Sequence, residues 1–232
     1  MSASNAKPAV VVVHGAWADG SSWARVIERL QSEDVAVVAA PIPLTSLSDD
    51  VQALDRTLER IAGPILLAAH AYAGAVIGAS RNERVSALAL VAALAPDEGE
   101  TVADVFYREP PHPMAPQLAP DSHGLIWMPD AGFASAFAQH ASDRDNALFA
   151  SVQRPIHVAC IQEKAPAPLW KRLPSWYFLA GQDRMISPRT QEFMASRMKA
   201  KLRRAAADHA PIATAPDEVA GFIRDALSAL SD

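Results

Sequence analysis

The chain has 232 residues, a net charge of −5 at pH 7 and a hydrophobic fraction of 50%. This length fits one domain, and the composition is ordinary for a soluble globular protein with a sizeable core. The acidic balance argues against nucleic acid or an acidic membrane surface as the main partner. No apolar run is long enough to span a bilayer, and no signal peptide is evident. The single cysteine, Cys160, excludes an intramolecular disulfide, so we expect a cytoplasmic protein.

Apolar runs typical of buried strands alternate with helix-like segments in the first part of the chain. One helix is expected to begin behind Ser21 or Ser22, and another to be capped by Ser46 or Ser48 and stopped at Gly63. Strands this apolar are covered on both faces, which indicates a parallel sheet in an α/β fold. The expected strands cover residues 9–13, 35–40, 64–69 and 84–94.

The alternation stops between residues 97 and 172. This segment is rich in proline, as in "REPPHPMAPQLAP", and contains short helical pieces such as "DAGFASAFAQHAS". We interpret it as a cap inserted into a core formed by residues 1–96 and 173–232. After the cap, the sequence predicts strands at 175–181 and 200–207 and helices at 187–199, behind a Ser187 cap, and at 215–230.

Loops that follow the strands carry the residues typical of a catalytic site. In an open parallel sheet, sites form beyond the carboxyl ends of the strands. The stretch "AAHAYAG" follows the third strand and resembles a turn that carries a nucleophile at its apex, most often as G-x-S-x-G. The apex here is Ala71, whose methyl group cannot attack a substrate. Asp183 and His209 follow the last two strands, and the order apex, acid, histidine is that of an α/β-hydrolase triad.

Several segments together resemble the small α/β-hydrolases related to plant methylesterases and hydroxynitrile lyases and to bacterial esterase-like proteins. The resemblance covers nearly the whole chain. It implies an α/β-hydrolase fold with a mostly parallel central sheet, helices on both faces and a small inserted helical cap. In the family the turn has the sequence G-H-S-Y-G-G, from which this chain departs at Ala69, Ala71 and Ala73. The segments that carry the resemblance are "VVVHGAWADGSSW", "LTSLSDDV", "AAHAYAGAVI", "ALVAALAPDEGETVADV", "PSWYFLAGQDRMISP" and "ADHAPIATAPDEVA".

The remaining members of the site can be present without the nucleophile. His209 is expected to be the general base, because imidazole exchanges protons near neutral pH. Asp183 is expected to orient that ring and to stabilise its charged form. The backbone N–H groups of Ala16 and Tyr72 are expected to form the oxyanion hole. Asp97, after the fourth strand, is the rival candidate for the acid.

The pocket under the cap is expected to bind a small apolar or ester-like substrate. Simple packing beneath the cap explains its aromatic and apolar residues equally well. His14 and His70 lie beside backbone turns, where a structural role is the commoner one. The spacing of the other histidines suggests no metal site, and no organic cofactor is implied. The residues expected to line the pocket are His14, Trp17, Tyr107 and Trp127, together with Tyr72, Met128 and Phe133.

Ala71 leaves three hypotheses open. In the first, the protein is an esterase whose serine has been replaced by alanine. In the second, His209 and Asp183 activate water or the substrate directly, for hydrolysis, elimination or cofactor-free oxygenation. In the third, the protein is a non-catalytic homologue that binds a small ligand. We favour a hydrolase that acts on a small ester-like or carbonyl substrate. The sequence is compatible with both a monomer and a homodimer.

Overall fold

A six-stranded sheet with the order β2-β1-β3-β4-β7-β8 forms the centre of the computed structural model, which describes residues 7–230. Every neighbouring pair in this sheet is parallel, so the carboxyl ends of all six strands lie at one edge. The predicted parallel sheet is therefore confirmed. Its strands are β1 (Ala9–Val13), β2 (Val37–Ala40), β3 (Ile65–His70), β4 (Val85–Val91), β7 (Ser175–Ala180) and β8 (Lys201–Ala205).

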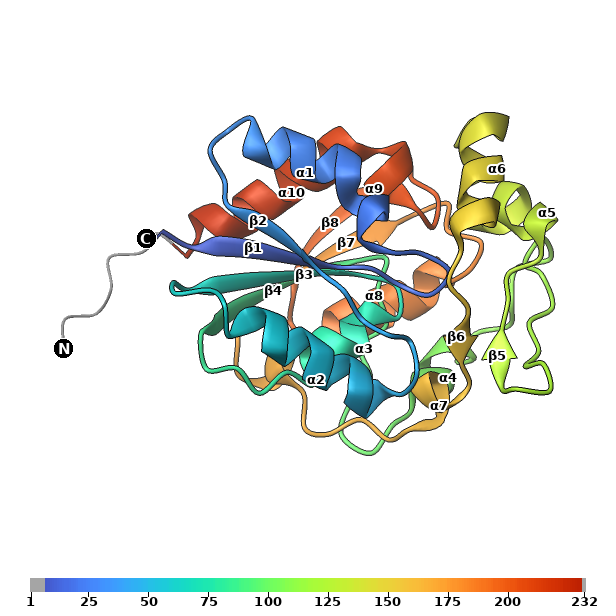
Figure 1. Cartoon of the computed structure of the whole chain (residues 1–232), viewed down its shortest axis with the longest axis horizontal. Helices are drawn as coiled ribbons and strands as arrows, with labels where there is room; N and C mark the ends of the chain where they lie inside the picture. The colour runs from blue at the N-terminus through green and yellow to red at the C-terminus, as the bar shows by residue number, and fades with distance from the viewer. Residues whose placement is uncertain (1–6, 231–232) are drawn as a thin grey trace.

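Helices cover both faces of the sheet (Figure 1). Successive residues of a strand point to opposite faces, so Val10 and Val12 pack with the helices of one face and Val11 and Val13 with those of the other. This two-sided burial is the reason that the strands are continuous apolar runs. One face carries α1 (Ala24–Gln31), α9 (Pro211–Thr214) and α10 (Pro216–Ser228), and the other carries α2 (Leu47–Leu58), α3 (Ala73–Gly78) and α8 (Pro188–Arg197).

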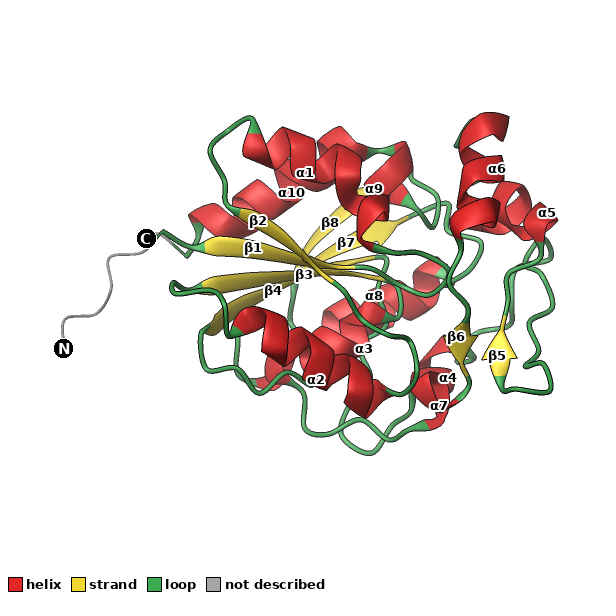
Figure 2. Cartoon of the chain, viewed as in Figure 1, coloured by secondary structure: helices red, strands yellow, loops and turns green. Residues whose placement is uncertain are grey.

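The chain between β4 and β7 forms the cap, beside the carboxyl ends of the strands (Figure 2). The cap limits at residues 97 and 172 stay a prediction. Within residues 7–230, no helix is long and apolar enough to cross a membrane. The elements of the cap are α4 (Val102–Phe106), β5 (Leu125–Ile126), α5 (Asp130–Gly132), the π-helical turn η2 (Phe133–Phe137), α6 (Asp143–Val152), β6 (Ile156–His157), α7 (Ala159–Gln162) and the 3₁₀ turn η3 (Leu169–Lys171).

The starts of three helices test the predicted caps. Ser46 caps α2 by accepting a hydrogen bond from Asp49, and Ser187 caps α8 in the same way, so both predictions are confirmed. The expected cap at Ser21 or Ser22 is wrong. Asp19 accepts the hydrogen bond from the Ser21 backbone and begins a 3₁₀ turn, η1 (Gly20–Trp23), before α1.

Two predicted ends lie too far along the chain. Helix α2 ends at Leu58 and not at Gly63, because the chain leaves the helix in a turn in which the Ile61 N–H donates to the Leu58 carbonyl. Strand β4 ends at Val91, since the next residue, Ala92, has a φ of 44° that no strand can contain. The residues after β4 instead support the turn that follows β3.

Candidate active site

Ala71 lies at the apex of the sharp turn between β3 and α3. Its φ of 51° is in the left-handed region, which costs a non-glycine residue on the order of 1–3 kcal/mol. The turn is held by hydrogen bonds from the Leu94 N–H to the Ala71 carbonyl (2.9 Å) and from the Ala71 N–H to the Val91 carbonyl (3.3 Å). A strained turn of this kind presents the nucleophile in α/β-hydrolases. The backbone is therefore that of a nucleophile turn, although its side chain is a methyl group.

Gly74 allows α3 to pack closely against the chain after β4. A Cβ atom at this position would lie 2.4 Å from the Leu94 carbonyl oxygen and 2.9 Å from the Ala93 Cβ. We expect Gly74→Ala to lower the free energy of unfolding by about 1–3 kcal/mol through overpacking. Gly78→Ala in the same helix is the control, because its Cβ would meet nothing closer than 3.7 Å. Urea denaturation compares the two variants, and equal stability would contradict the close packing.

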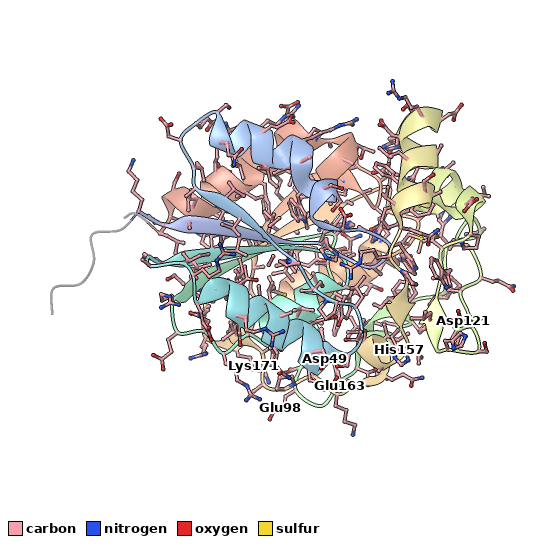
Figure 3. All side chains as sticks on the ribbon, in the orientation of Figure 1. Asp49, Glu98, Asp121, His157, Glu163 and Lys171 are labelled. Carbon is pink, nitrogen blue, oxygen red and sulfur yellow. The ribbon has the colours of Figure 1, made fainter. Side chains whose placement is uncertain are left out.

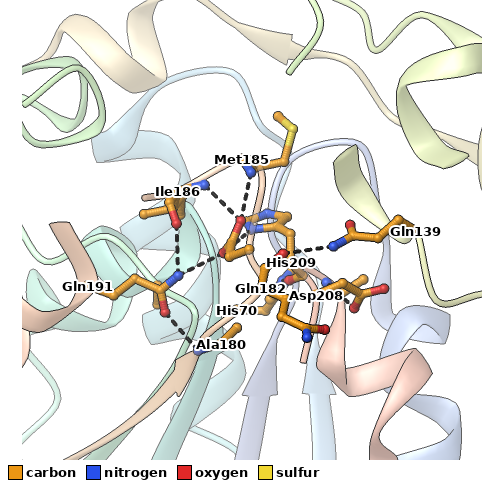
Figure 4. Close-up of polar contacts among 12 residues, drawn as sticks. His70, Gln139, Ala180, Gln182, Met185, Ile186, Gln191, Asp208 and His209 are labelled. Carbon is orange, nitrogen blue, oxygen red and sulfur yellow. Dashed lines mark hydrogen bonds and ion pairs between the residues drawn. The ribbon is translucent and has the colours of Figure 1, made fainter. Parts of the chain in front are cut away.

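Asp183 and His209 follow β7 and β8 and meet at the carboxyl edge of the sheet (Figure 4). The His209 Nδ1–H donates to Asp183 Oδ2 over 2.9 Å, and both residues are buried. Gln191 Nε2 donates to the same oxygen (2.9 Å), and the Met185 and Ile186 N–H groups donate to Oδ1 (2.7 and 2.8 Å). These bonds fix the carboxylate and orient the His209 ring.

Asp97, the rival acid, does not contact His209. Its carboxylate pairs with Lys171 Nζ at 2.5 Å on the partly exposed surface of the protein. The geometry therefore joins His209 to Asp183.

The backbone of His209 is held by two neighbouring buried groups. His70 Nε2 donates to the His209 carbonyl over 2.6 Å, and burial lowers the pKa of the His70 imidazole to about 3, so this ring is neutral. Asp208 accepts hydrogen bonds from the His140 N–H (2.9 Å) and from Thr214 Oγ1 (2.6 Å). The predicted structural role of His70 agrees with this position. The sequence analysis did not single out Asp208 or Gln191. The sequence feature that could have pointed to them is their position near His209 and Asp183 in the chain.

Ala16 and Tyr72 line the same cavity as Ala71 and His209. Within residues 7–230, neither N–H donates a hydrogen bond, although both residues are buried. Trp17 anchors the loop of Ala16 to the cap, because its N–H donates to the Arg154 carbonyl (3.0 Å) and its Nε1–H to the Ile126 carbonyl (2.9 Å). The two N–H groups are thus free to bind an oxygen atom.

The cavity at these residues has a volume of about 60 Å³ and an almost entirely apolar lining. Of the predicted pocket residues, Trp17, Tyr72 and Tyr107 line it. The other predictions need correction. His14 faces the chain instead, with its ring against the Gly15 carbonyl (2.9 Å) and the Ile42 N–H (3.5 Å).

Three more aromatic and apolar residues of the cap also lie away from this cavity. Trp127 is 47% exposed, and its indole donates to Asp121 (3.3 Å) on the outer surface of the cap, where Figure 3 labels Asp121. Met128 and Phe133 are buried in the apolar core beneath the cap. For Met128 and Phe133, packing is the correct interpretation. No group of three or more His, Cys, Asp or Glu side chains within residues 7–230 is arranged to hold a metal ion.

A buried polar cluster lies behind the residue that follows Ala71. The Tyr72 hydroxyl donates to Asp50 Oδ2 (2.7 Å), the Leu44 N–H donates to Asp50 Oδ1 (2.7 Å), and the Cys160 thiol lies 3.7 Å from Oδ2. Burial raises the pKa of the Asp50 carboxyl to about 6 and that of the Cys160 thiol to about 12. Cys160 is fully buried. Sequence reasoning missed Asp50, because an acid in the first turn of a helix is ordinary.

Comparisons with known proteins identify the family of the chain. The sequence profile of the alpha/beta hydrolase family matches residues 10–222, so the chain belongs to this family. The predicted fold is thereby confirmed. A search of the curated proteins finds no significant match.

Solved structures of several hydrolases are similar over nearly the whole chain. Polyneuridine aldehyde esterase has a TM-score of 0.83 and 17% identity, covering 98% of this chain and 100% of its own. A pyrethroid hydrolase from Sphingobium faniae has a TM-score of 0.79 and 17% identity, covering 96% and 98%. A methylesterase from Arabidopsis has a TM-score of 0.78 and 15% identity, covering 96% and 99%. At these identities the likeness concerns the fold.

Proposed function

We propose that this protein hydrolyses small ester-like or carbonyl substrates and that His209 and Asp183 activate water directly, without a covalent intermediate. The observation that carries the proposal is the ordered pair itself, in which Asp183 accepts four hydrogen bonds and one of them comes from His209. A protein that only binds a ligand has no need of such a pair. The neighbouring folds, an esterase, a pyrethroid hydrolase and a methylesterase, support an ester as the substrate class.

In the proposed reaction, His209 Nε2 takes a proton from a water molecule that occupies the space left by the missing serine side chain. The hydroxide attacks the carbonyl carbon, and the tetrahedral oxyanion accepts hydrogen bonds from the Ala16 and Tyr72 N–H groups. Collapse of this intermediate breaks the bond to the leaving alkoxide, which receives the proton from His209. Asp183 stabilises the imidazolium between the two proton transfers.

The test is the hydrolysis of 4-nitrophenyl acetate by the unsubstituted protein, which has alanine at position 71. We expect His209→Ala to reduce turnover by at least about 100-fold, because general base catalysis contributes on this scale. His123→Ala, at an exposed histidine of the cap, is the control and should keep the parent rate. The time course should show no burst of nitrophenol, since no acyl-enzyme forms. A rate unaffected by His209→Ala would overturn the proposal and favour a homologue that only binds small ligands.

Two other features stay predictions from the sequence. A cytoplasmic location follows only from the composition and the single cysteine, and the choice between monomer and homodimer is open. Neither affects the proposed chemistry, because every group that it uses comes from one chain.

A further inference from the structure

The catalytic cavity is small for an ester substrate. Its volume is about 60 Å³, whereas a cavity of roughly 150 Å³ is needed to enclose a benzene molecule. It has room for a short acyl or methyl group next to Ala71 and His209. A larger substituent of the substrate would extend beyond this space.

A second cavity, of about 280 Å³, has Trp17 in common with the catalytic cavity. Its walls are mainly apolar and include Phe137, Phe149 and Ile212. His70 also lines it, and the buried Nδ1 atom of that ring has no hydrogen-bond partner within residues 7–230. The second cavity therefore combines an apolar wall with one unused buried acceptor.

The Phe137 ring contacts side chains that line the catalytic cavity. It stands edge-on to the His209 ring at 5.1 Å and to the Trp17 ring at 6.3 Å, measured between ring centroids. Both of those residues line the catalytic cavity, whereas Phe137 lines the second one. Rotation of this one side chain would connect the two spaces.

The backbone around Phe137 is suited to this role. Phe137 ends η2, and π-helical turns are rare and often found at functional sites. Hydrogen bonds fix the segment to the catalytic loops. Arg184 donates to the Ser135 carbonyl (2.8 Å), and Gln139 donates to the Gln182 carbonyl (2.7 Å; Figure 4). The backbone is thus held on both sides of Phe137, so the motion that we propose is confined to its side chain.

We propose that the second cavity is the subsite for an aryl or long alkyl group of the substrate and that Phe137 is the gate through which this group enters. The carbonyl group would lie between His209 and the N–H groups of Ala16 and Tyr72. The proposal rests on the proposed function, because it takes the substrate to be an ester. It adds the substrate class: esters with one short and one bulky apolar side.

The test measures binding and not turnover. Acetophenone and heptanophenone carry an ester-like carbonyl group but no leaving group, and titration calorimetry gives their affinities for the chain as given. We expect Phe137→Ala to strengthen heptanophenone binding by about fivefold or more, and acetophenone binding by less than about twofold, because only the long chain reaches the second cavity. Phe137→Leu, which keeps an apolar side chain, should act in the same direction if Phe137→Ala folds poorly.

Ala24→Trp is the control variant that fills part of the second cavity. Ala24 is exposed and lines the second cavity, so a large side chain there narrows the cavity without disturbing the core. Combined with Phe137→Ala, this substitution should remove the gain in affinity for heptanophenone and leave the affinity for acetophenone unchanged. Equal changes for both ketones, or a gain that survives Ala24→Trp, would overturn the proposal. Selective ketone binding without any ester hydrolysis would instead contradict the proposed function alone.

Discussion

Replacing Ala71 by serine is expected to raise the turnover of 4-nitrophenyl acetate by about 1,000-fold or more, since loss of the serine in a serine hydrolase costs on the order of a million-fold. The strained turn and the His209–Asp183 pair are already in place, and Ala16 and Tyr72 supply the proposed oxyanion hole. On this proposal, the hydroxyl is the group that is missing. The gain is limited by the Gly15 loop, which packs closely against the Ala71 side chain. A Cβ atom added at Gly15 would lie only 3.0 Å from the Ala71 Cβ, so the serine hydroxyl has little room on this side.

The measurement is a paired steady-state and rapid-mixing assay of the chain as given and of Ala71→Ser. The serine variant should also produce a burst of nitrophenol, which is the sign of an acyl-enzyme. His209→Ala in the serine background should abolish the gain, and Ala71→Gly, which relieves the backbone strain but adds no nucleophile, should not reproduce it. A serine variant no faster than Ala71→Gly would contradict the view that a nucleophile is all that this turn lacks.

The two forms together separate the hypotheses that the sequence left open. Activity of the chain as given that depends on His209 supports direct activation of water. Activity of the serine variant alone identifies an esterase whose serine has been replaced. If neither form hydrolyses 4-nitrophenyl acetate, the result favours a protein that binds a small ligand or performs other chemistry.

The positions of the strands and of the His209–Asp183 pair could be predicted from the sequence because they depend on local patterns. Buried parallel strands are continuous apolar runs, and residues that directly follow them must meet at one edge of the sheet. The alternation therefore placed Ala71, Asp183 and His209 together, and the structure agrees.

Contacts between distant segments could not be predicted in this way. The Tyr72–Asp50 hydrogen bond joins two helix starts, and the Trp17 indole reaches a carbonyl 109 positions away. The side chains of His14 and Trp127 illustrate the same limit. Both residue types are common in pockets, but His14 hydrogen-bonds to the neighbouring backbone and Trp127 to Asp121. The wall formed by Phe137 depends on a π-helical turn, for which the apolar pattern of the cap gave no signal.

Asp50→Asn is expected to make the protein more stable at pH 7 but not at pH 4. The pKa of the Asp50 carboxyl is about 6 in the folded protein, against an ordinary value of 3.8, because the side chain is buried. The folded protein therefore binds the extra proton between about pH 4 and 6 and loses stability as the pH rises through this window, by roughly 3 kcal/mol in total. Asparagine resembles the protonated carboxyl and carries no such cost.

Urea denaturation at fixed pH between 4 and 7.5 gives the difference in the free energy of unfolding between the variant and the parent. We expect the difference to be near zero at pH 4 and about 1–3 kcal/mol in favour of Asp50→Asn above pH 6.5, with part of the gain lost because the new amide meets the Tyr72 hydroxyl. Contributions from all other groups cancel in this difference. A difference that does not change with pH would show that Asp50 is ionised in the folded protein throughout.

His70→Gln is the reciprocal variant, because the glutamine amide keeps a donor for the His209 carbonyl. The pKa of His70 is about 3 when folded and 6.5 ordinarily, so the parent loses stability as the pH falls through that window, by roughly 5 kcal/mol in total. The advantage of His70→Gln over the parent should therefore grow as the pH falls, whereas that of Asp50→Asn should shrink. Between about pH 4 and 6 the two groups offset each other in the parent, one binding a proton on folding and the other releasing it. Asp50 and His70 thus keep the free energy of unfolding of the parent nearly constant across mildly acidic pH, and removing either group exposes the pH dependence that the other contributes.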